Sequence, residues 1–223
     1  MSLSLSLSCA KLCDYVAAQL NHLFPDPRRI TSHELLDSTT AALTRLEICF
    51  SQARPKRFHA GRSIKFNHLY SDQYLVFLWL LSNEIYLHSD DPTLADKVYY
   101  CNKALHSFDC IYSNKLPEHF MVLHGVGTVL GNAEYSDYFV TYHGCTVGQN
   151  AGLYPRFGLG VGLGTGASVL GNSVVGRDAS VGAGVTLVGT YVPDNHAVWR
   201  DSAGVVTLSE QKSHSIAREY FEY

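Results

Sequence analysis

The chain has 223 residues, of which 46% are hydrophobic and 17% are charged, so it can bury a core and does not have the composition of a disordered chain. Its net charge of -3 argues against a nucleic-acid-binding protein, which normally carries a basic face. The longest apolar run, residues 74–81, is too short to span a bilayer, and the N-terminus lacks the pattern of a signal peptide. We therefore expect a cytoplasmic protein with no membrane span.

The first half of the chain predicts helices. Apolar residues recur with helical spacing over residues 9–23, and two prolines follow that segment. Thr31 or Ser32 is suited to cap a second helix that continues to about residue 52, with Glu34 in its first turn. This half therefore begins with two amphipathic helices.

Two further helices are expected before the composition changes. Residues 71–88 are apolar almost all round, which predicts a buried helix with Ser71 as its N-cap. Asp91 is suited to cap a fourth helix, because Pro92 would then occupy its first position. That helix is expected to continue to about Phe108.

The six cysteines contain no CxxC pair, so the sequence does not support a structural zinc site. Cys9 and Cys13 would share one helix face, and we expect both to be buried thiols. Nothing in the sequence around Cys110 or Cys145 indicates an activated thiolate. No metal is expected.

The second half of the chain repeats every six residues. Seventeen of the 18 glycines lie from Gly125 onward, which marks a boundary near residues 108–116. The apolar anchors of the repeat are Phe157, Leu163, Val169, Val175, Val181 and Leu187. The same spacing continues backward, with looser chemistry and one break of four residues, through Val147, Thr141, Tyr135, Val129 and Leu123. A period of six predicts a solenoid of short parallel strands.

These repeats, preceded by a helical domain, resemble the serine acetyltransferases of the hexapeptide-repeat acyltransferase superfamily, in a variant similar to the enzymes of surface-polysaccharide biosynthesis. The resemblance covers roughly residues 65–199. The matching segments are DQY at 72–74, LADK at 94–97, NKAL at 102–105, VLHGVGTVLG at 122–131, CTVG at 145–148 and the later coils.

The resemblance implies an α+β protein with three parts. These are an α-helical domain at residues 1–108, a left-handed parallel β-helix at residues 109–199, and a C-terminal tail at residues 200–223. It also implies a homotrimer that binds acetyl-CoA between neighbouring subunits. Because the helical domain is shorter than in many family members that pair trimers through it, we favour a trimer over a hexamer.

The resemblance assigns catalytic roles to His124 and Asp109. In the family, a histidine of the first coils is the general base, and an aspartate fifteen residues upstream assists it; His124 and Asp109 have that spacing. A hydroxyl needs its proton removed as it attacks a thioester, and histidine titrates near neutral pH. An adjacent carboxylate would hold the imidazole in the required tautomer.

Three uncharged residues separate this chain from the family members that acetylate serine. Leu123 replaces an aspartate, and Leu153 and Tyr154 replace an Arg-His pair. Because an amino acid's charges would lose their partners there, we expect acetyl transfer to a sugar or polysaccharide hydroxyl. Serine O-acetylation, N-acetyl transfer to an amino sugar and a non-catalytic binding scaffold remain as alternatives.

Further site residues are expected around this pair. His143 lies one 18-residue coil plus one residue beyond His124, so it should lie near it and bind the acceptor, unless it only fills a corner. Tyr154 and Arg156 lie in residues 149–156, the stretch that holds the four extra residues. This stretch is expected to project and bind the acceptor, with a solvated loop as the alternative. By resemblance, CoA meets the small positions Gly164, Thr165, Ala183 and Gly184, which corner packing alone would also explain.

Overall fold

The computed structural model describes residues 3–211 and 213–223, which form two compact units. The helical unit contains the described residues up to Ser51 together with Pro55–Ser107 and Ile111–Ser113. The β-helix unit contains Gln52–Arg54, Phe108–Cys110 and Asn114–Tyr223. No helix among the described residues is both long enough and apolar enough to cross a membrane.

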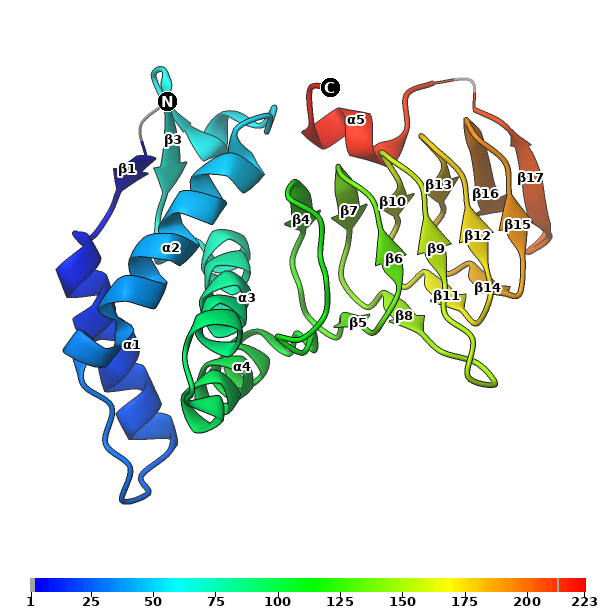
Figure 1. Cartoon of the computed structure of the whole chain (residues 1–223). Coiled ribbons are helices and arrows are strands. Elements are labelled where there is room, and N and C mark those ends of the chain that lie inside the picture. Colours follow the sequence, from blue (N-terminus) through cyan, green and yellow to red (C-terminus); the bar gives the residue numbers. More distant parts are fainter. Residues whose placement is uncertain (1–2, 212) are drawn as a thin grey trace. The chain divides into compact units, whose positions relative to one another are not determined.

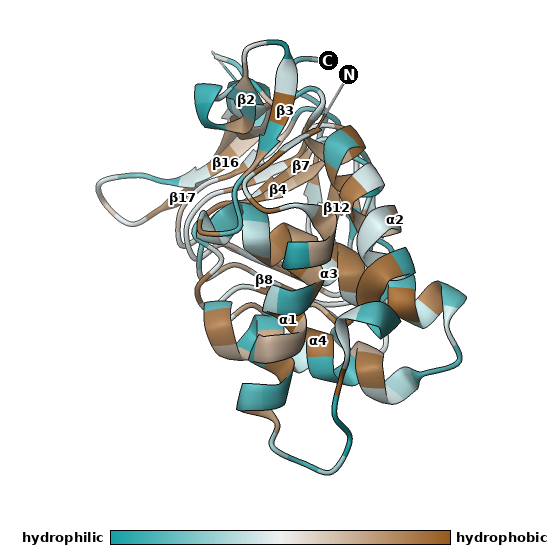
Figure 2. Cartoon of the chain, turned by 90° about the vertical axis from the view of Figure 1, so that its left-hand side faces the viewer, coloured by the Kyte–Doolittle hydropathy of each residue, from teal (hydrophilic) through white to brown (hydrophobic). Residues whose placement is uncertain are grey.

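Four helices occupy the helical unit at the predicted places. They are α1 (Cys9–Leu23), α2 (Ser32–Phe50), α3 (Ser71–His88) and α4 (Pro92–His106). α3 is buried along most of its length. The other three helices carry both apolar and polar residues and bury only part of their surface (Figure 2). α4 ends before the predicted Phe108 because Ser107 adopts a left-handed conformation with φ of 52°, which terminates helices.

The predicted N-caps Thr31 and Asp91 are confirmed, and the predicted N-cap of α3 is not. The carboxylate of Glu34 accepts hydrogen bonds from the Thr31 backbone and hydroxyl at 2.8 and 2.6 Å. These bonds, with Arg28 beside them, lower the pKa of Glu34 to about 2. The prediction that Ser71 caps α3 is wrong, because Tyr70 takes that position and its side chain makes no capping hydrogen bond.

A small sheet in the helical unit was not predicted. Its strands are β1 (Leu3–Leu5), β2 (His59–Ala60) and β3 (Ser63–Phe66), in the order β1-β3-β2. The 3₁₀ turn η1 (Lys56–Phe58) directly precedes β2. β1 runs parallel to β3, and β2 runs antiparallel to it. Strands of two to four residues are too short to show the alternation that identifies a strand in a sequence.

Three parallel sheets form the sides of the β-helix (Figure 1). Sheet I contains β4 (Phe120–Val122), β7 (Phe139–Thr141), β10 (Gly162–Leu163), β13 (Ser180–Val181) and β16 (His196–Arg200). Sheet II contains β5 (Val129–Leu130), β8 (Thr146–Gly148), β11 (Ser168–Leu170) and β14 (Thr186–Val188). Sheet III contains β6 (Glu134–Tyr135), β9 (Arg156–Phe157), β12 (Val174–Val175) and β15 (Tyr191–Val192).

The predicted anchors of the later coils point into the β-helix. All six, from Phe157 to Leu187, are between 0 and 3% exposed. The backward extension is out of register at Leu123 and Val129, because their neighbours Val122 and Leu130 pair with the anchors Thr141 and Val147. Val129 is 39% exposed, whereas Leu130 is buried. The inward-facing Leu130 therefore follows the inward-facing Val122 by eight positions. In the next two coils the equivalent step, from Thr141 to Val147 and from Leu163 to Val169, is six positions. The first coil has two extra residues at this corner.

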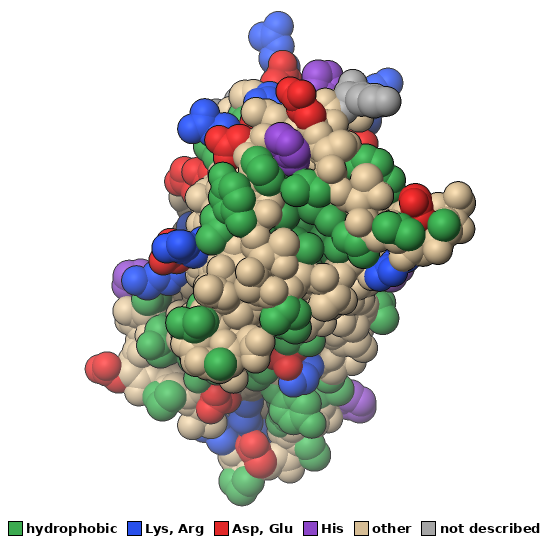
Figure 3. All heavy atoms as spheres, turned by 90° about the vertical axis from the view of Figure 1, so that its right-hand side faces the viewer, with side chains coloured by type: hydrophobic (Ala, Val, Ile, Leu, Met, Phe, Trp, Pro, Cys, Tyr) green, Lys and Arg blue, Asp and Glu red, His purple; other side chains and the backbone are tan. Residues whose placement is uncertain are grey.

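The last residues cover one edge and one side of the β-helix. β17 (Val206–Glu210) pairs antiparallel with β16 and protects the end of sheet I. Figure 3 shows apolar side chains on the surface at this side of the molecule. Trp199 of β16 and Leu208 of β17 are both exposed. α5 (Ile216–Tyr220) packs on β7 and β10, and a Cβ at Gly162 would lie only 2.4 Å from the Cβ of Ile216, so glycine permits this contact.

An ionic and aromatic cluster fastens this C-terminal segment. The Arg218 guanidinium donates to both carboxylate oxygens of Asp178, at 3.0 and 3.1 Å, and the Tyr223 hydroxyl donates to the same carboxylate at 2.6 Å. The ring of Tyr223 stacks on that of Tyr138, with centroids 4.0 Å apart. Asp178 is 7% exposed, so the cluster satisfies a carboxylate that would otherwise be costly to bury.

Candidate active site

His124 lies at the longer corner between sheets I and II. Its φ is 60°, a left-handed conformation that costs a non-glycine residue about 1–2 kcal/mol. The turn is held by hydrogen bonds from the Leu123 amide to the Thr141 carbonyl at 2.8 Å and from the Thr128 amide to the Gly125 carbonyl at 3.1 Å. Backbone strain of this kind is concentrated at functional sites. The His124 side chain is exposed at this corner.

Asp109 pairs with the strand that follows this corner. Its amide donates to the Thr128 carbonyl at 2.9 Å, and its carbonyl accepts from the Leu130 amide at 2.8 Å. It thereby forms an isolated parallel bridge to Val129. Because Thr128 is also hydrogen-bonded to Gly125, two backbone hydrogen bonds connect Asp109 to the turn that begins at His124. Asp109 is half-buried.

His143 lies beside His124 on the next coil. The centroids of the two imidazole rings are 6.2 Å apart. Strand register explains the contact, because Val122 pairs with Thr141 and each histidine follows its own member of that pair by two residues. The same register places Thr165 and Ala183 at this corner in the two coils that follow. One edge of the β-helix therefore presents two histidines followed by two small residues.

The two glycines of this edge are favoured for different reasons, close backbone approach at Gly164 and a left-handed conformation at Gly184. A Cβ at Gly164 would lie 3.0 Å from the Ala183 amide nitrogen, and Gly184 has a φ of +66°. The Gly184 amide donates to the Thr165 carbonyl at 2.8 Å, which keeps successive coils in register. Thr165 and Ala183 are exposed. The structure thus brings the four positions expected to meet CoA to the same edge as His124.

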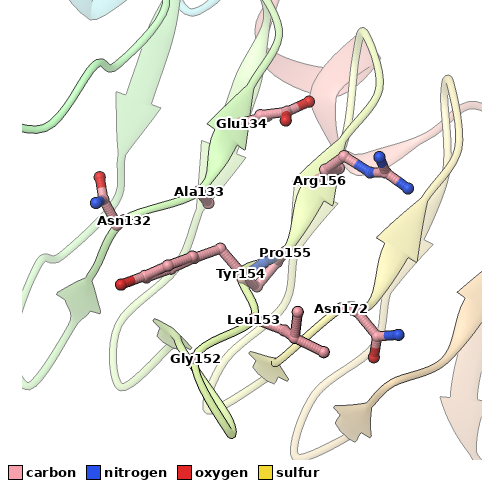
Figure 4. Close-up of a pocket in the computed structure, with 9 residues that line it drawn as sticks. All are labelled: Asn132, Ala133, Glu134, Gly152, Leu153, Tyr154, Pro155, Arg156 and Asn172. Atoms are coloured by element: carbon pink, nitrogen blue, oxygen red, sulfur yellow. The ribbon is translucent and has the colours of Figure 1, made fainter.

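A pocket of about 430 Å³ lies at a different corner, between sheets II and III. Its lining residues are Asn132, Ala133, Glu134, Gly152, Leu153, Tyr154, Pro155, Arg156 and Asn172 (Figure 4). Tyr154 extends toward Asn132, and the loop that carries it comes between β8 and β9. The structure therefore places the predicted acceptor residues Tyr154 and Arg156 together, but it does not bring them to His124 within one chain.

Glu134 is a residue of this pocket that sequence analysis missed. It pairs in register with Arg156 on the neighbouring strand, so a carboxylate and a guanidinium stand side by side on sheet III. Both are exposed. The repeat could have revealed this pair. Glu134 and Arg156 each directly precede an anchor, and these two anchors, Tyr135 and Phe157, are paired on neighbouring strands.

Two other residues near the corner are unsuited to direct chemistry. Leu123, which replaces an aspartate of the family pattern, is 1% exposed and offers no surface to an acceptor. Cys145 is fully buried and its thiol donates to the Gly164 carbonyl at 3.1 Å. Burial raises the pKa of the Cys145 thiol, which opposes formation of a nucleophilic thiolate.

Helices followed by a parallel β-helix of six-residue repeats define the class of hexapeptide-repeat β-helix proteins. No family model matches the chain. A serine acetyltransferase of Synechococcus elongatus is 36% identical over 75 residues, which are 31% of each chain. Serine acetyltransferase 2 of Arabidopsis thaliana is 30% identical over 111 residues, which are 48% of this chain and 34% of the relative. The chain thus spans about a third of the curated relatives it matches.

Solved structures show the same fold. The serine acetyltransferase of Brucella abortus superposes with a TM-score of 0.68 and 18% identity, over 92% of this chain and 85% of its own. A second structure of that enzyme contains coenzyme A. The expected resemblance to serine acetyltransferases and the expected left-handed parallel β-helix are both confirmed.

Proposed function

We propose that the chain is an acetyl-CoA-dependent O-acetyltransferase in which His124 is the general base and Asp109 orients it. The observation that carries the proposal is the corner itself. His124 is held there in a strained conformation, next to the strand that pairs with Asp109, on an edge that continues into small exposed residues. The similarity to serine acetyltransferases, one of them solved with coenzyme A, supports the same chemistry.

The proposed reaction transfers one acetyl group and moves one proton. His124 removes the proton of the acceptor hydroxyl while the oxygen attacks the thioester carbonyl. The carbon–sulfur bond then breaks, and the imidazolium returns the proton to the departing thiolate, so the products are an acetyl ester and free CoA. The Asp109 carboxylate stabilises the imidazolium and selects its tautomer. A positioned base of this type contributes about 10²–10⁴ in rate.

The edge beyond His143 is the proposed track of the CoA arm. Thr165, Ala183 and Gly184 are exposed and have little or no side chain, so a pantetheine chain could approach their backbone closely. At the buried Gly164 the missing side chain makes room for the next coil, which keeps this track narrow. Backbone N–H groups of such a track could also donate to the developing oxyanion. No metal has a part in this scheme.

Serine is the acceptor that the comparisons favour, instead of the sugar expected from the sequence. The expectation of a sugar rested on missing charges at three positions. The pocket restores one charge of each sign, because Arg156 could bind a carboxylate and Glu134 an ammonium. A sugar hydroxyl remains the second candidate because the uncharged Tyr154, Asn132 and Asn172 line the same pocket.

An acceptor panel tests the function. Release of free thiol from acetyl-CoA is measured with L-serine, neutral sugars and amino sugars at equal concentration. The proposal expects acceptor-dependent release, fastest with L-serine. Fastest release with a neutral sugar would establish the second candidate, and no release with any acceptor would contradict acetyl transfer.

We further propose a homotrimer. Because the pocket and His124 occupy different corners of one chain, an acceptor bound in the pocket needs the His124 of another copy. Mass measurement in solution tests this proposal, with three times the chain mass of 24.7 kDa as the expected result.

A further inference from the structure

Asn114 is a buried polar residue close to the segment that carries Asp109. It is 5% exposed, and its side-chain amide donates to the Leu130 carbonyl at 2.7 Å. The same amide nitrogen lies 3.7 Å from the sulfur of Cys110, which directly follows Asp109. A buried amide side chain with two partners of this kind fixes the positions of both.

Leu130 joins Asn114 to Asp109. Its amide donates to the Asp109 carbonyl at 2.8 Å, while its own carbonyl accepts from Asn114. The same strand residue therefore holds one backbone group of Asp109 and the side chain of Asn114. Leu130 is itself 1% exposed, so it provides a rigid support.

The regular structure described at Asp109 is short. Its pairing with β5 is a single isolated bridge, and the chain leaves the β-helix unit at Ile111–Ser113 before returning at Asn114. One bridged residue is weakly constrained, because a ladder gains stability from successive pairs. Asn114 is the first residue after the chain returns to the β-helix unit. Its side chain bonds to Leu130 of β5, the same strand that pairs with Asp109.

We infer that Asn114 is a positioning residue for Asp109, acting through the Leu130 strand and Cys110. Its role in turnover rests on the proposed function, because it assumes that Asp109 orients the general base. The Asn114 side chain is not proposed to contact a reacting atom. Its contribution is to keep the Asp109 segment in one place while the proton moves at His124.

A double-mutant cycle separates this role from a general loss of stability. Asn114→Ala is expected to lower kcat about tenfold, a part of the 10²–10⁴ that a positioned base contributes, and to leave KM for acetyl-CoA unchanged. In an Asp109→Asn background the same change should cost less than twofold, because the positioned carboxylate has already been lost.

Asn102 provides a matched control. It is 2% exposed, and its side-chain amide donates to the Leu75 carbonyl at 3.0 Å, so it makes the same kind of bond within the helical unit. Asn102→Ala should leave kcat within twofold in both backgrounds. Asn114→Leu, which keeps the size of the side chain but removes the donor without burying a charge, replaces the alanine variant if that variant does not fold.

Hydrogen exchange tests the geometry without any need for turnover. The amides of Asp109 and Leu130 should exchange at least tenfold faster in Asn114→Ala than in the wild type, and they should be unchanged in Asn102→Ala. Unchanged exchange, or equal loss of kcat with and without Asp109, would overturn the inference. If the wild type released no CoA, the proposed function would fail while the exchange result still decided whether Asn114 holds the Asp109 segment.

Discussion

The first coil of the β-helix and the coils that follow it differ at one corner. From the second coil on, six residues separate the inward-facing residues across the corner between sheets I and II, and glycines take its left-handed positions. In the first coil eight residues cross that corner, and a histidine takes a left-handed position. The regular coils are typical of a stable scaffold, and the irregular one carries His124, the proposed general base.

The largest expected effect tests the register of the first coil. Leu130→Ala should lower the free energy of unfolding by about 2–5 kcal/mol, because it leaves a cavity among buried side chains. Val129→Ala is the matched control and should change stability by less than about 0.5 kcal/mol, because Val129 faces outward. Urea denaturation measures both. The reverse order would show that the six-residue spacing continues through the first coil.

The next effect tests whether the irregular corner is the catalytic one. Asp109→Asn should lower kcat about 10²-fold, because the neutral amide no longer stabilises the imidazolium. KM for acetyl-CoA should stay within twofold, since Asp109 is not on the proposed CoA track. Steady-state thiol release measures both constants. A fall in affinity with unchanged kcat would instead make Asp109 a binding residue.

A smaller effect is expected where the C-terminal segment is fastened to the regular coils. Arg218→Ala should destabilise the protein by about 1–3 kcal/mol, because Asp178 remains buried without its cation. Arg177→Ala changes the exposed arginine next to Asp178 and should cost less than about 0.5 kcal/mol. Thermal unfolding of the two variants compares them. Equal stability would show that the cluster adds nothing to the scaffold.

The smallest effect lies outside the β-helix and depends on pH. Because the pKa of Glu34 is lowered from 4.5 to about 2, its stabilising contribution is present above pH 4.5 and is lost as the pH falls toward 2. Glu34 is largely exposed, so solvent screening limits this contribution to about 1 kcal/mol or less. Glu34→Gln should therefore be less stable than the wild type at pH 7, and the difference should vanish near pH 2. A constant difference at both pH values would contradict the ionic origin.

The regular parts of the molecule could be predicted from the sequence because their environment repeats. Each anchor from Phe157 to Leu187 takes the equivalent inward-facing position on its own side of the β-helix, so one rule covers all of them. The same counting places His143 beside His124. The shift at Val129 could not be predicted, since Leu123 and Val129 are apolar, lie six residues apart and are direct neighbours of the inward-facing Val122 and Leu130. Glu134 and Asn114 were missed for a related reason, because their roles depend on strand register and on where the chain re-enters the β-helix.

Turnover by His124→Ala decides whether this histidine is the general base. Thiol release from acetyl-CoA is measured with the best acceptor of the panel, and CoA binding is measured by calorimetry on the same preparation. The account predicts a loss of turnover of about 10²–10⁴-fold with CoA affinity nearly unchanged, because His124 moves the proton and the track beyond His143 holds CoA. Wild-type turnover by this variant would contradict the account.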